Sequence, residues 1–126
     1  MPHSHAVVRI DHQKARVLKF DAEHLEARKI KEHSDHTRQH GSAVRTEHEY
    51  FGEVCDALAG VGEVLITGPH TALSDFRRYV EKHCAALGGQ IVGWEPVDHP
   101  SDGELVAFAR KHFLEHDRMA GTSPLG

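Results

Sequence analysis

The sequence of residues 64–76 is Val-Leu-Ile-Thr-Gly-Pro-His-Thr-Ala-Leu-Ser-Asp-Phe, in which Gly68-Pro69 joins a short apolar run to an amphipathic segment. The apolar run, residues 64–67, is typical of a strand that is buried on both faces. The glycine–proline pair predicts a turn that ends this strand. Beyond the turn, apolar residues recur at helical spacing, and we expect one helix that stops at Gly88-Gly89. The buried face of that helix is expected to consist of Leu73, Phe76, Val80, Cys84 and Leu87.

The N-terminal part of the chain has the period of strands. Three strands are expected at residues 5–11, 15–21 and 25–31, and their spacing predicts an antiparallel meander. The third run alternates apolar and charged residues, which is typical of a half-exposed strand. Residues from Glu32 to about Glu47 are polar and rich in histidine, and we expect a long loop there, extending to about residue 48.

The C-terminal part alternates helices and strands. Apolar spacing predicts a helix around residues 50–58, and a further strand is expected at residues 91–94. The segment Ser101-Asp-Gly-Glu104 is a capping box, which predicts the start of a last helix. The expected buried face of the last helix is Leu105, Ala109, His112, Phe113 and His116.

The predicted order is therefore β-β-β-α-β-α-β-α, an α/β fold of the ribonuclease-H-like kind. Strands that alternate with helices are joined by right-handed crossovers, so the later strands are expected to be parallel. We predict a mixed five-stranded sheet in which the first strand lies beside the fourth. One domain is expected over residues 1–126, with a frayed tail from about residue 121.

Composition limits the classes of function. Of the 126 residues, 39% are hydrophobic and 27% are charged, which is typical of a folded domain. The net charge of -4 argues against a generally basic nucleic-acid binder, so any RNA contact needs a local basic patch. The sequence shows no secretory signal and no membrane-spanning run, and we expect a cytoplasmic protein. Cys55 and Cys84 are then expected to be reduced thiols of the core.

Two stretches of the C-terminal half resemble a known family. Residues 64–76 are similar to the strand, glycine turn and helix start of the middle domain of eukaryotic and archaeal release factors and of Pelota. Residues 91–105 resemble the next strand and helix of that domain. Short bacterial translational machinery proteins are also similar, at residues 5–12 and 97–103. The resemblance covers nearly the whole chain and implies a ribonuclease-H-like fold and a partner in translation, either the ribosome with its RNA or a translation factor.

The same resemblance bears on catalysis. Release-factor middle domains act through a Gly-Gly-Gln tripeptide on the long loop after the third strand. Here Gly88-Gly89-Gln90 instead follows a predicted helix and leads into a strand, which is an ordinary helix stop. The counterpart loop contains Gln39-His40-Gly41-Ser42 in place of the tripeptide. We therefore expect no peptidyl-tRNA hydrolysis. Pelota also lacks the tripeptide, so its loss is compatible with ribosome binding without hydrolysis.

Acidic residues raise a second hypothesis, a metal-dependent hydrolase or nuclease of ribonuclease-H-like fold. Such nucleases need several carboxylates that converge on two Mg²⁺ ions. Asp11 ends the first predicted strand, and Asp98 and Asp102 lie near the last helix. The alternative, which we favour, is that Asp11 caps a hairpin turn and Asp98 precedes a loop.

Histidine is unusually frequent, with 13 residues, and raises a third hypothesis of a metal- or pH-responsive interaction protein. His33, His36 and His40 would share one face if the polar loop became helical, and could then hold Zn²⁺ or Ni²⁺. The polar composition favours a solvated loop without a cofactor. His112 and His116 are expected to pack on the inner side of the last helix.

Cations suggest where RNA or a protein partner would bind. Lysines and arginines gather before the polar loop, within it and along the second helix, and such a set could contact phosphates. The alternative is a solvated charged face. The candidate binding residues are Arg28, Lys29, Lys31, Arg38, His40, Arg45, Arg77 and Arg78.

Overall fold

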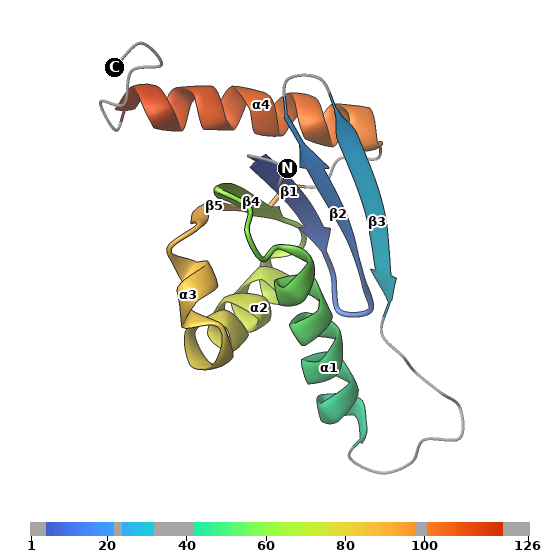
Figure 1. Cartoon of the computed structure of the whole chain (residues 1–126). Helices are drawn as coiled ribbons and strands as arrows, with labels where there is room; N and C mark the ends of the chain where they lie inside the picture. The colour runs from blue at the N-terminus through green and yellow to red at the C-terminus, as the bar shows by residue number, and fades with distance from the viewer. Residues whose placement is uncertain (1–4, 22–23, 32–41, 98–100, 120–126) are drawn as a thin grey trace.

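The computed structural model describes residues 5–21, 24–31, 42–97 and 101–119. The five strands form one mixed sheet in the order β3-β2-β1-β4-β5, which confirms the predicted five-stranded α/β fold (Figure 1). The strands are β1 (His5–Ile10), β2 (Lys14–Phe20), β3 (Leu25–Lys31), β4 (Glu63–Thr67) and β5 (Ile91–Glu95). The helices are α1 (Ser42–Ala57), α2 (His70–His83), α3 (Ala85–Gly88) and α4 (Asp102–Met119).

The helices cover the sheet from both sides, with α4 over one face and α1, α2 and α3 over the other (Figure 1). Strand β4 lies between these layers, as its apolar sequence predicts. Val64 and Ile66 belong to the hydrophobic cluster on the side of α1 and α2, and Leu65 belongs to the cluster under α4. All three side chains are fully buried. The cores on the two sides of the sheet therefore meet at β4.

Strand β1 pairs in parallel with β4, as predicted, and its register runs from His5 opposite Glu63 to Arg9 opposite Thr67. Thr67 is a buried polar residue of this pair, and its Oγ1 donates a hydrogen bond of 2.9 Å to the carbonyl oxygen of Val8. A buried hydroxyl is tolerated when it has such a partner. The strand–turn–helix unit around Gly68 is thus tied to β1 by both backbone and side-chain bonds.

Strand β3 differs from its prediction as a half-exposed strand. Only Ile30 is buried, and the other six residues of β3 are exposed. The reason is its position at the edge of the sheet, where the helices cover the strand only near its C-terminal end. Charged residues on an edge strand also discourage pairing with another chain.

The polar loop is shorter than predicted, because residues 42–48 belong to the first turns of α1. The prediction was wrong there because the stretch has no apolar period. A helix that is anchored by packing at Tyr50, Phe51 and Val54 can extend into a polar segment, since each added residue gains one backbone hydrogen bond. Residues 32–41 lie outside the described part of the chain.

The helix predicted to run to Leu87 is broken at Cys84, whose backbone angles are φ -137° and ψ 48°. The amide of Cys84 still bonds to the carbonyl oxygen of Val80, and a separate short helix, α3, follows. The break allows Leu87 to be buried against the same cluster as Val80. Cys55 and Cys84 are both free thiols, as expected. Burial and the neighbouring Cys84 raise the pKa of Cys55 far above its usual range.

The last helix begins as its capping box predicts. The amide of Glu104 donates to Oγ of Ser101 at 3.2 Å, and that hydroxyl lies 3.1 Å from Oε1 of Glu104. Leu105, Ala109 and Phe113 are buried beneath α4, whereas His112 and His116 are only partly buried. The predicted buried face of the helix is therefore confirmed for Leu105, Ala109 and Phe113.

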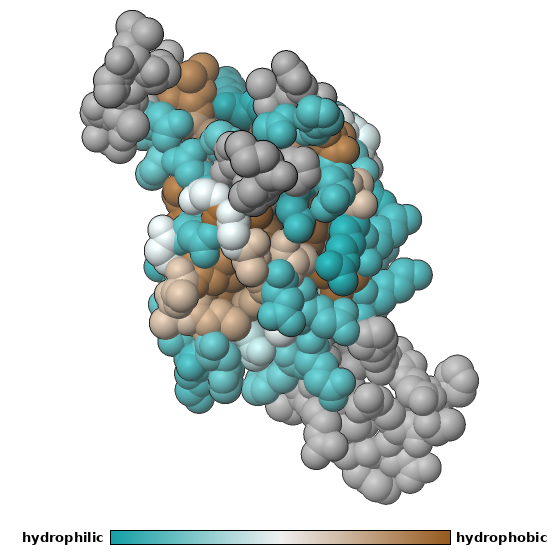
Figure 2. All heavy atoms as spheres, in the orientation of Figure 1, coloured by the Kyte–Doolittle hydropathy of each residue, from teal (hydrophilic) through white to brown (hydrophobic). Residues whose placement is uncertain are grey.

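Hydrophilic side chains cover most of the surface in Figure 2, and a paler area lies over α3, whose exposed residues are small. Leu25 and Leu114 are the large hydrophobic residues that are exposed in the described ranges. None of the helices in those ranges is long and apolar enough to cross a membrane.

The turn after β4 provides a test of the fold. Gly68 has a φ of 140°, and a Cβ there would overlap the carbonyl oxygen of Ile10 in β1. We expect Gly68→Ala to lower the free energy of unfolding by about 3 kcal/mol or more, because strain and overlap add. Gly60 has a φ of 84° but open space around it, so Gly60→Ala should cost only about 1 kcal/mol. Urea denaturation of both variants measures the difference, and equal losses would contradict the close approach of Gly68 to β1.

Candidate functional site

The pairing of the first three strands brings five cations to one face of the sheet. Residues that pair across antiparallel strands point to the same face. Arg9 lies opposite Arg16, and Arg16 lies opposite Lys29. In the next pair on the same face, Lys14 lies opposite Lys31. We call Arg9, Lys14, Arg16, Lys29 and Lys31 the basic sheet face.

The charges of the basic sheet face are only partly neutralised. Nη1 of Arg16 lies 2.9 Å from Oδ1 of Asp102 at the start of α4, and Nη1 of Arg9 lies 3.7 Å from Oδ2 of Asp11. The three lysines are exposed, and none of the salt bridges among the described residues involves them. Like charges on directly opposite residues destabilise a sheet. The arrangement therefore costs stability and favours an anionic partner.

The basic sheet face lies beyond the part of the sheet that α4 covers. Helix α4 packs on Val7, Leu18, Phe20 and Leu65, which are on the same face but toward the start of β1. On the edge strand even Ala27 is exposed. Hydrophilic side chains dominate the side of the molecule on which β3 lies (Figure 2). Within the described ranges, α4 therefore leaves this end of the sheet uncovered.

The predicted binding residues are divided between two regions. Lys29 and Lys31 belong to the basic sheet face, whereas Arg28 pairs with Val17 and points to the opposite face, toward α1. Arg77 and Arg78 lie on α2, where the guanidinium of Arg77 stacks over the ring of Trp94 at 5.6 Å. Trp94 is on β5, at the other edge of the sheet from β3. The α2 cations therefore do not extend the basic sheet face.

Some of the predicted residues cannot be placed. Arg38 and His40 are outside the described residues, as are the candidate metal ligands His33 and His36. Arg45 lies on α1, but its side chain is outside the description. Binding by these residues stays a prediction.

Sequence reasoning missed Arg9, Lys14 and Arg16. The available signal was the alternation of β1 and β2 together with the short turn between them, which fixes which residues face each other. Oδ1 of Asp11 accepts hydrogen bonds from the amides of Gln13 and Lys14, at 2.7 and 2.8 Å, so this turn is tightly defined. Asp11 therefore caps the hairpin turn, as favoured above.

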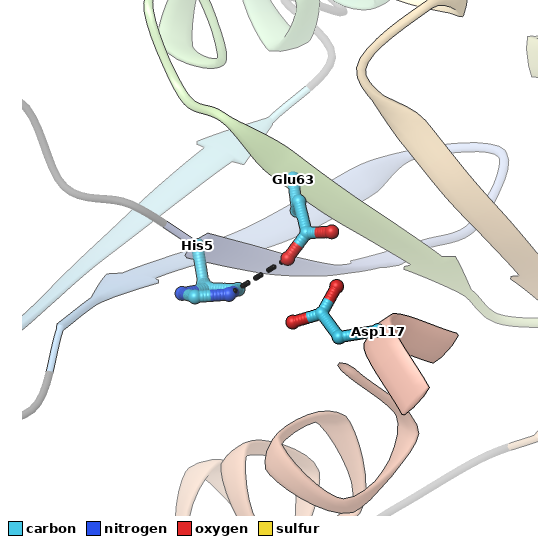
Figure 3. Close-up of side chains that lie close together, drawn as sticks. All are labelled: His5, Glu63 and Asp117. Atoms are coloured by element: carbon cyan, nitrogen blue, oxygen red, sulfur yellow. Dashed lines mark hydrogen bonds and ion pairs between the residues drawn. The ribbon is translucent and has the colours of Figure 1, made fainter. Parts of the chain in front are cut away.

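A second cluster of charges lies at the opposite end of β1, where His5, Glu63 and Asp117 come together (Figure 3). Nε2 of His5 lies 2.9 Å from Oε1 of Glu63, and one potential ligand atom from each of the three residues lies within 4.8 Å of the others. His116 adds Nε2 at 4.0 Å from Oε2 of Glu63. Among the described residues, Asp11 and Asp102, the acids considered for a nuclease, are not part of such a group, and Asp98 lies outside the description.

The environment of this cluster perturbs Glu63. Burial and the neighbouring Asp117 carboxyl raise the pKa of Glu63 above its usual value of 4.5, and His5 only partly opposes them. Two carboxyl groups at close range disfavour a double negative charge unless a proton or a cation lies between them. The cluster was not predicted, because its members are far apart in the sequence.

Packing fixes the ring of His5. Its centroid lies 4.6 Å from that of Phe113 and 5.9 Å from that of Phe20, so an aromatic side chain of α4 and one of β2 flank the imidazole. A surface hollow adjoins the cluster, and its lining includes Arg110, which lies over the ring of Phe20. The imidazole is thus oriented toward Glu63 before any ligand arrives.

The tripeptide Gly88-Gly89-Gln90 has the structural role that the sequence predicts. Gly88 ends α3, and β5 begins at Ile91. The side-chain amide of Gln90 donates to the carbonyl oxygen of Val61, and the backbone carbonyl oxygen of Gln90 accepts from the backbone amide of Val64 at 2.8 Å. These bonds hold Gln90 against the start of β4, away from any loop.

The raised pKa of Glu63 predicts how its replacement changes stability with pH. At a pH below the pKa that Glu63 has in the unfolded chain, this carboxyl is protonated in both the folded and the unfolded state. The contribution of its raised pKa to the stability of the fold is then at its greatest. That advantage is lost as the pH rises through the folded pKa. With a chelator present, Glu63→Gln should therefore gain stability relative to the native protein as the pH rises through the range above 4.5, the usual pKa of this carboxyl. Urea unfolding across this range tests it, with the exposed Glu115→Gln as control, and a difference that is flat or falls with pH would contradict it.

Comparisons with known proteins define the fold of the chain. No protein-family model matches it, and no curated protein matches it by sequence. Among solved structures, Pelota from Thermoplasma acidophilum matches with a TM-score of 0.58 and 20% identity, over 86% of this chain and 32% of that one. Archaeoglobus fulgidus Pelota gives 0.65 and 15%, over 93% and 33% of the two chains.

An archaeal translation termination factor gives a TM-score of 0.56 and 13% identity, over 94% of this chain and 42% of that one. The chain thus spans less than half of the length of each of these proteins. At such low identities the likeness concerns the fold alone. In its fold, the chain resembles a domain of Pelota and of the archaeal termination factor, as the sequence resemblance implied.

Proposed function

We propose that the chain is a cytoplasmic, non-catalytic protein of translation that binds ribosomal RNA through the basic sheet face. One observation carries this proposal: Arg9, Lys14, Arg16, Lys29 and Lys31 gather on a single face of a sheet in a chain whose net charge is -4. Such local concentration against an acidic background favours a polyanion that docks in one orientation.

The chemistry of this face suits the phosphate backbone of RNA. Lysine and arginine side chains neutralise phosphates and release their counterions, which gives an affinity that depends steeply on salt. Tyr50, Phe51 and Phe76 are buried in the core and cannot stack on bases, and the half-buried Trp94 lies under Arg77 at the other edge of the sheet from β3. We therefore propose contacts to the backbone of structured RNA and not sequence-specific reading of single strands.

The choice of ribosomal RNA rests on likeness. The fold is shared with Pelota and with an archaeal translation termination factor, and the sequence resembles release-factor middle domains. A shared fold alone does not define a function, so the ribosome enters as part of the proposal. A role in stress response or ribosome rescue is the finer expectation, and a translation factor is the alternative partner.

The non-catalytic character is supported by the positions of the candidate groups. Gln90 is bonded to Val61 and Val64, so its tripeptide cannot reach into a distant active site without breaking the fold. Asp11 caps a turn, and Asp102 is paired with Arg16. These acids already have partners that stabilise the fold.

Ribosome co-sedimentation tests the proposal. Lys14, Lys29 and Lys31 would be changed together to Gln, which removes three exposed charges. We expect the native chain to sediment with ribosomes at low salt and the triple variant to bind at least about tenfold more weakly. The slope of log affinity against log salt should fall by about 0.7 to 0.9 for each phosphate that the variant no longer neutralises.

The matched control changes Arg77, Arg78 and Lys82 of α2 to Gln, an equal change in charge on the other side of the sheet. This variant should keep its binding. If the α2 variant loses binding and the β-strand variant does not, the basic sheet face is not the contact. If the native chain stays at the top of the gradient at all salt concentrations, the ribosomal assignment is wrong.

A further inference from the structure

Three elements that are distant in the sequence present potential metal ligands to one point. His5 begins β1, Glu63 begins β4 and Asp117 lies near the end of α4 (Figure 3). The parallel register places His5 directly beside Glu63, and the carboxylate of Asp117 points toward them from α4. Atoms that surround a zinc ion at about 2.1 Å lie roughly 3.4 Å apart. The potential ligand atoms lie within 4.8 Å of one another, so binding of an ion would draw them closer together.

The charges of the cluster favour a cation. Glu63 and Asp117 are partly buried, and potential ligand atoms of their two carboxyl groups lie within 4.8 Å of each other, an arrangement that a cation between them would stabilise. The surrounding titratable groups are His5 on β1 and His116 on α4, and the nearest cation of the adjoining hollow is Arg110. Arg110 is engaged elsewhere, since it lies over Phe20 and donates to the carbonyl oxygen of Asp21.

The ligand set is also arranged in advance. Phe20 and Phe113 flank the imidazole of His5, and backbone pairing between β1 and β4 fixes the side chain of Glu63 beside it. Ligands that are locked by packing bind a metal with less loss of conformational freedom. His116 lies next to the cluster, with Nε2 at 4.0 Å from Oε2 of Glu63.

We propose that His5, Glu63 and Asp117 bind one divalent transition-metal ion, with Zn²⁺ as the best-suited ion. Imidazole nitrogen combined with carboxylate oxygen suits zinc, whereas Mg²⁺ and Ca²⁺ prefer oxygen ligands alone. The site is distinct from the three histidines of the polar segment that the sequence suggested as ligands, His33, His36 and His40. It also lies at the opposite end of β1 from the basic sheet face, so it does not depend on the proposed function.

The expected role of the ion is structural. It would join the C-terminal half of α4 to the first residues of β1 and β4. A ligand that binds only the folded state stabilises that state. The stabilisation grows with the logarithm of the ratio of the free ligand concentration to the dissociation constant. Zn²⁺ should therefore raise the melting temperature of the chain, and its removal should loosen the end of α4.

The test uses the untagged full chain, stripped of metal with a chelator and then titrated with Zn²⁺ in a calorimeter. Because the polar segment could bind zinc by itself, every variant is made in a background with His33→Ala, His36→Ala and His40→Ala. In that background we expect one Zn²⁺ per chain, bound with micromolar or tighter affinity, and a rise in melting temperature. Mg²⁺ at the same concentrations should give neither effect.

Two isosteric substitutions locate the site. Loss of a residue that only hydrogen-bonds to a metal ligand weakens metal binding by roughly 10- to 100-fold. Glu63→Gln and Asp117→Asn remove a ligand itself, so each should weaken Zn²⁺ binding by more than this. Circular dichroism of the metal-free variants shows that each is folded, and either variant alone is sufficient for the comparison. The exposed Glu115→Gln on the same helix is the matched control and should bind zinc as the background does.

Other outcomes would overturn the proposal. Loss of all zinc binding in the background variant would assign the metal to the polar segment. Unchanged affinity in both Glu63→Gln and Asp117→Asn would show that zinc binds elsewhere. Substitution with Co²⁺ gives an independent reading, since visible absorption of a tetrahedral centre should appear in the background chain and be absent from both ligand variants.

Discussion

The parallel pairing of β1 with β4 is the constraint on which most of the structure depends. It joins the N-terminal meander to the helical half of the chain, and it brings Val7 and Leu65 to one core and Val8 and Ile66 to the other. Parallel neighbours require a long crossover, which here includes α1 packed on the sheet. The tight passage of Gly68 past Ile10 and the bond from Thr67 to Val8 belong to the same contact. Without this pair the two halves would have no common core.

Much of this architecture follows from local patterns. The apolar run of β4, the turn at Gly68 and the capping box at Ser101 each have a period or a residue type that defines one structure. The features that escaped prediction depend on packing between distant elements. The break at Cys84 allows Leu87 to pack into the core. The shape of that core is set by other elements, so the sequence of the helix alone does not predict the break. The exposure of β3 depends on how far the helices extend over the sheet. The sequence pattern of a strand does not predict this coverage.

The charged sites show the same limit more clearly. A count of cations along the chain finds Lys29 and Lys31 but groups them with Arg28, which the alternation of the strand turns to the other face. Arg9 and Arg16 become relevant only when the register is known, because a lone arginine in a strand is ordinary. His5 and Asp117 lie near the two ends of the chain, and nothing in either neighbourhood indicates that they approach. Sequence finds the residue types, and topology decides which of them share a site.

Helix α4 relates the two charged regions to each other. Asp102 and Glu104 occupy its first turn, where the partial positive charge of a helix N-terminus stabilises acidic groups, and Asp102 also pairs with Arg16 of the basic sheet face. Its other end carries partial negative charge and places Asp117 beside Glu63, where a cation is favoured. The helix therefore moderates the positive charge at one end of β1 and adds negative charge at the other. A chain that is acidic overall thereby keeps the basic sheet face and the cluster of His5, Glu63 and Asp117 apart on one strand, because the helix lying across that strand separates them.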